Sequence, residues 1–321
     1  MDDEKTTNKN PANKKPAMIS WRGDVTKLSS LRLKGFALAA PPMLWLLFLL
    51  TIPCISFIFI ALAQRGEYGD VVWNFSAHNL KRLIGFGSFG WSIDYLKILG
   101  RSLLVALVTT VACVALAYPL TFHVATRPRK SRVFWLTLII VPFWTNVVVR
   151  TYAWLLVLGP NLPPAKLAAW VGLIPAGTAL YPSSMAVYLG MITTFLPFMA
   201  LPLYASVERL NWDLLEAAKD LYASRWQVFR QAILPQTWPG LSVGIIVTFV
   251  PAMAMFVVTD ILGGAKYMLI GNLIQQQFSQ ARDWPFGAAL SVALMVMTLI
   301  SLSVFRRRKI NLDQNINLDQ N

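Results

Sequence analysis

The stretch Asn211–Gly240, NWDLLEAAKDLYASRWQVFRQAILPQTWPG, is a long polar interruption in the otherwise apolar second half of the chain. Its beginning predicts a short helix capped by Asn211, because an Asn side chain satisfies the free N–H groups of a first helical turn. The pattern Ser224-x-x-Gln227 is that of a capping box and predicts a second short helix, which we expect Pro235 to end. The stretch therefore predicts a polar helical hairpin between apolar segments.

The first of these helices has an apolar face and an acidic side. Apolar and small residues recur at the spacing of one helix face, at Leu214, Ala217, Ala218 and Leu221. Glu216 and Asp220 lie four residues apart, and such a like-charged pair slightly destabilises an isolated helix. The pair suggests a partner that supplies positive charge, whereas the spacing alone fits a solvated amphipathic loop on lipid headgroups equally well.

The composition is that of a membrane protein. The chain has 321 residues, of which 56% are hydrophobic and only 14% are charged, whereas about a quarter of the residues in soluble domains are charged. Six apolar runs approach or exceed the ~20 residues that cross a bilayer. These predicted spans are Phe36–Ala63, Ser102–Ala125, Val133–Leu158, Ser183–Val207, Leu241–Thr259 and Phe286–Phe305. The sequence thus predicts an all-α membrane protein with six transmembrane helices and both termini on the same side.

The net charge of +14 follows this topology. Basic residues gather in the N-terminal tail, the turn after the second span, the polar hairpin with its flank, and the C-terminal tail. Because basic loops remain inside the cell, these segments are expected to be cytoplasmic. We therefore attribute the basic excess to topology and expect no nucleic-acid partner. The predicted organisation is a cytoplasmic tail at 1–35, a membrane domain at 36–305 with the polar loop at 208–240, and a second cytoplasmic tail at 306–321.

Other function classes lack their sequence signatures. Cys54 and Cys113 lie in apolar runs and imply no disulfide framework, and His78 and His123 have no metal-binding pattern around them. Paired catalytic carboxylates and nucleophile motifs are also missing, so we expect no catalytic residues and no metal site. An ion-coupled carrier usually has ionisable residues within the membrane, and apart from Arg150 these spans contain almost none. That class remains a less favoured alternative.

The triplet Glu216-Ala217-Ala218, followed by Leu234-Pro235, resembles the cytoplasmic EAA loop of membrane subunits of type I ABC importers. In that family the loop forms coupling helices that dock on the ATPase. The resemblance therefore implies a set of coupling residues, namely Glu216, Ala217, Ala218, Lys219, Asp220, Leu221, Tyr222, Ala223 and Ser224. The family pattern has Gly where this chain has Tyr222. Because glycine adopts a positive φ at low cost, we expect a shallower bend here.

Longer stretches are similar to spermidine/putrescine ABC permeases: LLEAAKDL, VPFWTNVVVRTYAW at Val141–Trp154, and DILGGAKYMLIGNLIQQQF with RDWPFGAA after Asp260. The similarity implies polyamine import across a bacterial inner membrane. It also implies three partners, which are an ATPase dimer, a second homologous permease subunit and an external periplasmic solute-binding protein. The chain has no G-x-x-x-x-G-K-[ST] loop, so we expect no enzyme activity and no cofactor in it, with ATP and Mg²⁺ on the ATPase. Permeases for opines or other nitrogenous solutes are similar enough to remain alternatives.

A polyamine pathway needs carboxylates, polar groups and aromatic faces that make cation–π contacts. The candidate pathway residues are Asp260, Trp144, Asn146 and Tyr152. Anchoring at the membrane interface explains the two aromatic residues equally well, and Asp260 also fits the end of a helix. Arg150 would repel a polycation, so we expect it to extend toward the interface or to pair with a carboxylate. A further helix, with one apolar side, is predicted over Tyr267–Gln280 at the outer membrane face.

Overall fold

The computed structural model describes residues 28–67, 69–87, 90–91, 93–264 and 267–318, with side chains within 38–67, 69–86, 93–264 and 267–303. Most of the predicted N-terminal tail, and the end of the C-terminal tail, lie outside the described residues. The chain divides into two units, Met1–Ile55 and Ser56–Asn321.

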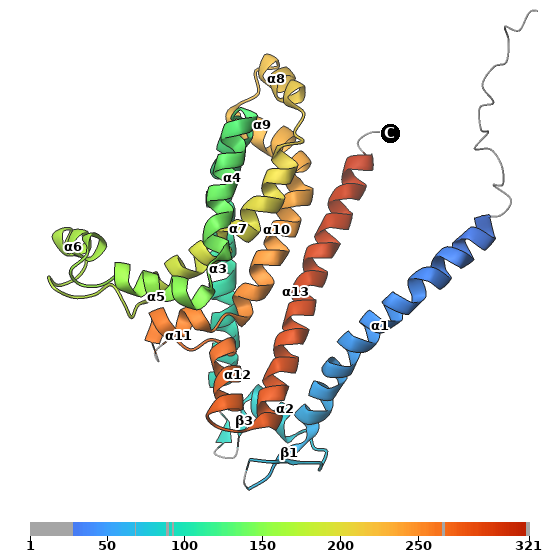
Figure 1. Cartoon of the computed structure of the whole chain (residues 1–321), viewed down its shortest axis with the longest axis vertical. Helices are drawn as coiled ribbons and strands as arrows, with labels where there is room; N and C mark the ends of the chain where they lie inside the picture. The colour runs from blue at the N-terminus through green and yellow to red at the C-terminus, as the bar shows by residue number, and fades with distance from the viewer. Residues whose placement is uncertain (1–27, 68, 88–89, 92, 265–266, 319–321) are drawn as a thin grey trace, which may run out of the picture. The chain divides into compact units, whose positions relative to one another are not determined.

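The described chain is mostly helical (Figure 1). Its helices are α1 (Leu28–Leu62), α2 (His78–Ile84), α3 (Asp94–Ala125), α4 (Arg129–Trp144), α5 (Val147–Val157), α6 (Pro163–Trp170), α7 (Ser184–Val207), α8 (Trp212–Asp220), α9 (Arg225–Val228), the π-helical turn η2 (Phe229–Ile233), α10 (Leu234–Ala254), α11 (Val257–Gly263), α12 (Ile270–Ser279) and α13 (Trp284–Leu318). Two antiparallel pairs of two-residue strands accompany them: β1 (Gln64–Arg65) with β2 (Val71–Val72), and β3 (Phe86–Gly87) with β4 (Gly90–Trp91).

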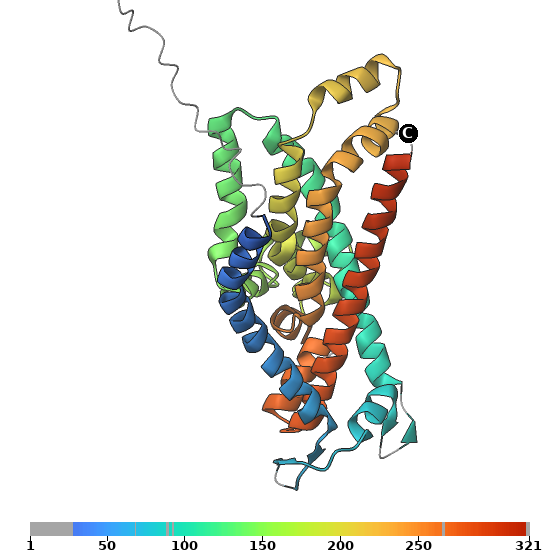
Figure 2. The ribbon, with the colours of Figure 1, turned by 90° about the vertical axis from the view of Figure 1, so that its right-hand side faces the viewer.

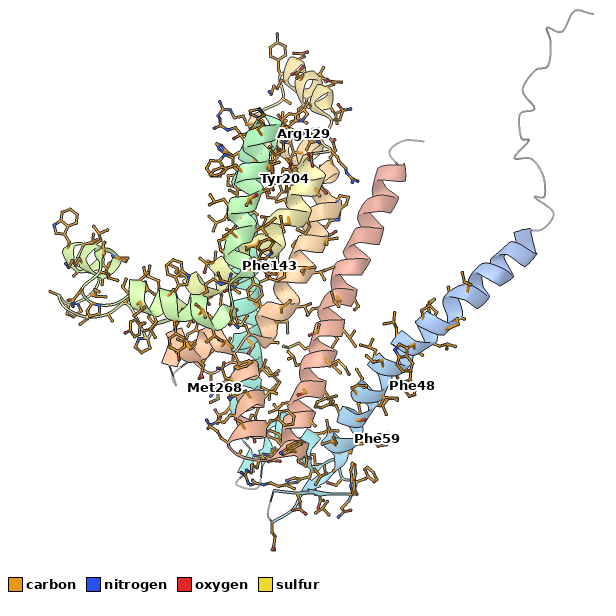
Figure 3. All side chains as sticks on the ribbon, viewed as in Figure 1. Phe48, Phe59, Arg129, Phe143, Tyr204 and Met268 are labelled. Carbon is orange, nitrogen blue, oxygen red and sulfur yellow. The ribbon has the colours of Figure 1, made fainter. Side chains whose placement is uncertain are left out.

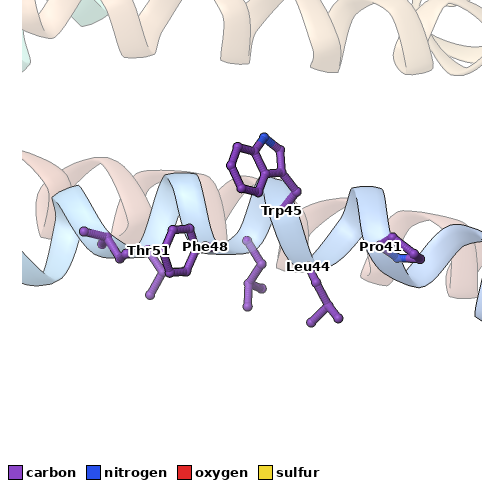
Figure 4. A pocket seen from close by; sticks show the side chains of 7 residues that line it. Pro41, Leu44, Trp45, Phe48 and Thr51 are labelled. Carbon is purple, nitrogen blue, oxygen red and sulfur yellow. The ribbon is translucent and has the colours of Figure 1, made fainter.

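The described part of the first unit is the N-terminal portion of α1. This helix contains Pro41, Pro42 and Pro53, which membrane helices tolerate. A shallow apolar hollow runs along it (Figure 4). The hollow is lined by Pro41, Leu44, Trp45, Leu47, Phe48, Thr51 and Ile52. A long helix with such an apolar surface is typical of a bilayer environment.

The second unit is built around α3, α7 and α10, each of which packs against the other two. Their facing side chains form one buried cluster that includes Val105 of α3, Met199 of α7 and Met253 of α10. Small residues bring α7 and α10 close together, because a Cβ on Gly240 would collide with the carbonyl oxygen of Pro202. Close approach at small residues is a general mode of helix association in membranes.

Within the described residues, five helices are long and apolar enough to cross a membrane, and a bent pair raises the number to six. The predicted first, second, fourth and sixth spans coincide with parts of α1, α3, α7 and α13. The third predicted span, Val133–Leu158, is wrong as a single helix, because α4 and α5 meet at an angle of 97°. The break lies at Thr145, whose backbone is extended, and Asn146, whose side chain caps α5. An apolar run cannot reveal such a break, since both halves are apolar.

The fifth predicted span, Leu241–Thr259, differs at both ends. α9, η2 and α10 form one continuous run from Arg225 to Ala254. Pro235 therefore does not end the second short helix, contrary to the prediction. The wider π turn before it relieves the clash that a proline ring makes with the preceding α-helical turn. At the other end the run stops at Ala254, so that Asp260 lies in the separate helix α11.

The strands, α2 and α12 lie at the end of the second unit opposite α8 and α9 (Figures 1 and 2). α12 confirms the helix predicted over Tyr267–Gln280, and its Ile270 and Leu273 are buried on the predicted apolar side. Asn79 of α2 donates two hydrogen bonds, at 3.0 and 2.8 Å, to the carbonyl oxygens of Ala61 and Ala63. These bonds satisfy carbonyls that the end of α1 leaves free.

Arg82 and Asp283 connect α2 to the start of α13. Their side chains form an ion pair at 2.8 Å, and Arg82 also lies 3.9 Å from the centre of the Phe286 ring. Burial acts to lower the pKa of Arg82, but the hydrogen bond with Asp283 and the interactions with Tyr95 together outweigh it and raise that pKa above its ordinary value. Asp283 accepts the backbone N–H of Phe286 at 3.2 Å as well, which places one carboxylate at the N-terminus of a helix and beside a guanidinium.

Candidate functional site

The hairpin of α8 and α9 stands at one end of the second unit (Figure 2), at the same end as Arg129 at the start of α4 (Figure 3). Asn211 caps α8 as predicted, because its side-chain oxygen accepts the N–H of Asp213 at 3.1 Å. The predicted capping box of α9 is also confirmed. Ser224 Oγ accepts the N–H of Gln227 at 3.4 Å, and Gln227 Oε1 accepts the N–H of Ser224 at 2.8 Å. The starts of both helices are therefore determined by neighbouring residues.

The inner side of the hairpin is a small apolar cluster. Its buried members are Leu210, Leu215, Val228 and Ala232. Ala218 and Ala223 pack half-buried against them. The predicted apolar face is thus correct only in part, since Ala218 points inward while Leu214, Ala217 and Leu221 are exposed. Leu215, which anchors α8, was missed, although its spacing of three from Ala218 could have identified it.

The outer side of the hairpin combines charge with large apolar side chains. Most of the implied coupling residues are exposed here, namely Glu216, Ala217, Lys219, Asp220, Leu221, Tyr222 and Ser224. Leu221 is 82% exposed and Tyr222 is 98% exposed, and Trp226 nearby is 68% exposed. A polar loop that presents large apolar and aromatic side chains in this way is suited to contact with another protein.

Tyr222 takes the turn position that a glycine would favour. Its φ is 57°, so a tyrosine adopts the left-handed conformation between the two helices. The chain therefore makes the positive-φ turn that a glycine would make, whereas a shallower bend had been expected. For an L-amino acid this conformation costs about 1–2 kcal/mol, and the hairpin retains that strain.

A second candidate region is the break between α4 and α5. The side chain of Asn146 accepts the N–H of Val148 at 2.8 Å and so begins α5. Arg150 donates from Nη1 to the carbonyl oxygen of Pro142 at 3.1 Å. Arg150 thus bonds to a backbone carbonyl and not to a carboxylate, while its extension toward the interface stays a prediction. The end of α4 leaves carbonyl groups without helical partners, and a cation at a helix C-terminus is favourable.

The four candidate pathway residues lie on neighbouring elements. α5 and α11 pack against each other and run across the axis of the bundle (Figure 1). Asp260 is exposed on α11, while Trp144 ends α4 with 80% exposure and Tyr152 of α5 is 54% exposed. Among the described residues, no hydrogen bond or ion pair joins Asp260 to Asn146 or Tyr152. The fold thus brings these residues to one region without joining them into a formed site.

Asn272 is a structural residue of this region that the sequence analysis missed. Its side-chain oxygen accepts the hydroxyl of Thr259 at 2.7 Å and the N–H of Leu269 at 3.2 Å, and its nitrogen donates to the carbonyl of Phe256 at 3.1 Å. These bonds fix the break between α10 and α11. An amide within the apolar run 268–274 was the available signal, since a polar side chain in such surroundings needs hydrogen-bond partners.

No group of three or more His, Cys, Asp or Glu in the described part of the chain could hold a metal ion.

Comparison of the sequence with known proteins identifies related transport proteins. The model of a family described as "Binding-protein-dependent transport system inner membrane component" matches residues 117–310. The spermidine/putrescine transport system permease protein PotB of Escherichia coli (strain K12) is 38% identical over 275 residues, which are 86% of this chain and 98% of that protein. The protein of the same name from Haemophilus influenzae is 33% identical over 86% of this chain and 94% of its own length.

A solved structure has a similar fold. It is that of a bacterial alginate ABC transporter in complex with alginate pentasaccharide-bound periplasmic protein. One of its chains aligns with a TM-score of 0.60 and 15% identity, over 90% of this chain and 98% of its own length.

Proposed function

Because the chain belongs to the family of binding-protein-dependent transport system inner membrane components, we propose that it is the polyamine-translocating permease subunit of an ATP-driven importer. The observation that carries the proposal is the α8–α9 hairpin, which presents exposed apolar side chains and three carboxylates at one end of the helical bundle. The choice of polyamine rests on the relatives, whose names specify spermidine/putrescine transport.

The hairpin serves as the docking surface for one subunit of a separate ATPase dimer, which holds ATP and Mg²⁺. Leu221 and Tyr222 supply apolar contact area, and Glu216 and Asp220 face positive charge on the ATPase. Closure of the ATPase dimer then moves the hairpin, and the hairpin moves the spans to which it is joined. This chain transmits the energy of hydrolysis and does not itself hydrolyse ATP.

The remaining partners are those that the similarity to ABC permeases implies. The hairpin end faces the cytoplasm of the bacterial cell, with the tails at 1–35 and 306–321 on the same side, as the basic residues indicate. The region 36–305 forms the permease domain within the lipid bilayer. A second homologous permease subunit completes the pathway, and an external periplasmic binding protein delivers the solute to the end that contains α2 and α12.

The cargo passes close to the break between α4 and α5. Asp260 attracts an ammonium group, Trp144 and Tyr152 offer aromatic faces to it, and Asn146 lies at the break between them. When the ATPase dimer closes, the spans open outward to receive the solute from the binding protein. Hydrolysis returns them to the inward-facing state, and the solute is released into the cytoplasm.

The test of the cargo is uptake by the reconstituted complete complex, which contains both permeases, the ATPase dimer and the binding protein. We expect ATP-dependent uptake of radiolabelled spermidine or putrescine. An absence of polyamine uptake, together with uptake of an opine or another nitrogenous solute, would overturn the substrate assignment and favour that alternative. ATP-independent uptake driven by an ion gradient would favour a carrier.

The test of coupling is the substitution Glu216→Lys. Because it reverses a charge on the proposed docking surface, we expect it to abolish ATP hydrolysis stimulated by the binding protein while membrane insertion remains normal. Glu4→Lys is the control, since it makes the same charge reversal in the predicted N-terminal tail, outside the hairpin. Wild-type stimulation in the assembled Glu216→Lys complex would contradict the proposed role of the hairpin.

A further inference from the structure

The π-helical turn η2 lies where the coupling hairpin joins the membrane span α10. The N–H of Leu234 donates to the carbonyl oxygen of Phe229, which is the five-residue spacing of a π turn. Such single turns are rare and are frequently found at functional sites. Here the turn lets α9 continue into α10 without a break, so a displacement of the hairpin reaches the span through η2.

Two carbonyl groups at the end of η2 are held by side chains. Gln236 Nε2 donates to the carbonyl of Ala232 at 3.0 Å, and Thr237 Oγ1 donates to the carbonyl of Ile233 at 2.9 Å. Gln236 Oε1 also accepts the N–H of Asn211 at 3.0 Å, which connects the start of α8 to the start of α10. These bonds therefore stabilise the irregular turn and connect it to the start of α8.

Tyr118 of α3 connects a third helix to this turn. Its hydroxyl lies 3.0 Å from Thr237 Oγ1, where Thr237 is buried and Tyr118 is half-buried. A threonine hydroxyl has one proton, and we assign that of Thr237 to the carbonyl of Ile233 at 2.9 Å. Tyr118 is then the donor, and the chain of bonds runs from Tyr118 through Thr237 to the backbone of η2.

Aromatic rings extend the same connection to both helices of the hairpin. The rings of Tyr118 and Phe229 of η2 meet edge-on, with their centres 5.4 Å apart. Phe229 in turn stacks with Trp226 of α9, with 5.7 Å between the ring centres. The ring of Tyr118 also stacks with that of Phe122, with 6.4 Å between the ring centres. Phe122 meets Trp212, at the start of α8, edge-on with the same separation of 6.4 Å. One residue of α3 thus lies at the centre of contacts to α8, α9 and α10.

We propose that Tyr118 is a positioning residue for energy coupling, which holds η2 in its π-helical form so that movement of the hairpin is delivered to α3 and α10 together. This inference rests on the proposed function of the hairpin as the ATPase docking surface. Without the Tyr118 hydroxyl, η2 is free to change its hydrogen bonding when the hairpin is pushed. The push is then absorbed in the turn, and ATP is hydrolysed without a full movement of the spans.

The experiment uses the complete reconstituted complex and measures solute transported per ATP hydrolysed. Tyr118→Phe removes the hydroxyl but keeps the ring contacts, and Thr237→Val removes the other partner of the same bond. We expect either change to lower the ratio about five-fold, the factor that corresponds to one hydrogen bond of about 1 kcal/mol. Because both changes break one connection, the double variant should be no worse than the more affected single variant.

Thr194→Val is the matched control, because Thr194 is also buried and its hydroxyl donates within α7 to the carbonyl of Gly190. This variant should keep the wild-type ratio, whereas a purely structural effect of Tyr118→Phe would lower assembly and leave the ratio of the assembled complex unchanged. Hydrogen exchange provides a second measurement, and amides of 229–237 should exchange faster in Tyr118→Phe than in Thr194→Val.

A wild-type transport ratio in both Tyr118→Phe and Thr237→Val overturns the inference. The proposed function fails separately, through normal ATPase stimulation in Glu216→Lys. A coupling defect in Glu216→Lys combined with a wild-type ratio in Tyr118→Phe would therefore reject the role of Tyr118 and keep that of the hairpin.

Discussion

The α8–α9 hairpin and the region of α5, α11 and α12 differ in the contacts that give each its shape. The helices of the hairpin are started by neighbours in sequence, as when Asn211 accepts from Asp213. In the other region, α12 begins where the hydroxyl of Ser102 on α3, which is distant in sequence, accepts the N–H of Ile270 at 2.8 Å. The starts of the two hairpin helices are therefore encoded by neighbouring residues, whereas the start of α12 depends in addition on packing against a distant segment.

The largest expected effect tests that dependence on packing. Gly271 at the start of α12 lies so close to α10 that a Cβ would collide with the carbonyl oxygen of Ala254. Gly271→Ala therefore forces the backbone at the end of α10 to move, and we expect a loss of about 2–3 kcal/mol, the upper part of the range for overpacking. Thermal unfolding of the purified complex measures this loss as a melting temperature lower by several degrees.

The control for this change is Gly100→Ala on α3, where a Cβ would meet no atom within 4 Å. Since alanine favours a helix more than glycine does, by about 1 kcal/mol, Gly100→Ala should leave the stability unchanged or raise it. Equal melting temperatures for the two variants would mean that α12 and α10 do not approach as closely as described, and would remove the contrast between the two regions.

The sequence predicted the hairpin better than the pathway region for the same physical reason. Both caps of the hairpin, the apolar runs of most spans and the fold of an ABC-importer membrane subunit are confirmed. The break before Asn146 was missed because apolar composition is the same on its two sides. The continuation through Pro235 was missed because a π turn has no simple sequence pattern. Asn272 and Tyr118 bond to Phe256 and Thr237, which only the folded chain brings near them.

A second prediction tests whether the pathway region attracts the cargo. Asp260→Asn keeps the shape of the side chain and removes its charge. A carboxylate and an ammonium group at close range retain about 1–2 kcal/mol after desolvation, so we expect roughly ten-fold slower polyamine uptake. Asp94→Asn is the control, because Asp94 is an exposed aspartate at the start of α3. Uptake by Asp260→Asn as fast as that of the control would remove Asp260 from the pathway.

The smallest expected effect concerns the strained turn of the hairpin, and it tests whether Tyr222 itself determines the shape of that turn. Tyr222 is 98% exposed and has a φ of 57°. In Tyr222→Gly the left-handed conformation no longer costs energy, and about 1 kcal/mol of local stability should be gained. Hydrogen exchange of the amides of 212–228 should slow by a corresponding factor of about five.

Tyr222→Ala separates this strain from the contacts of the ring, because alanine removes the ring but keeps the Cβ that makes a positive φ costly. If the turn is encoded locally, exchange should be slower in Tyr222→Gly than in Tyr222→Ala. If the ring also contacts the ATPase, both variants should lose binding-protein-stimulated hydrolysis to the same extent. Equal exchange in the two variants would mean that the turn carries no strain at Tyr222. Contacts with a distant segment or with the ATPase would then determine the shape of the hairpin, as they do for the pathway region.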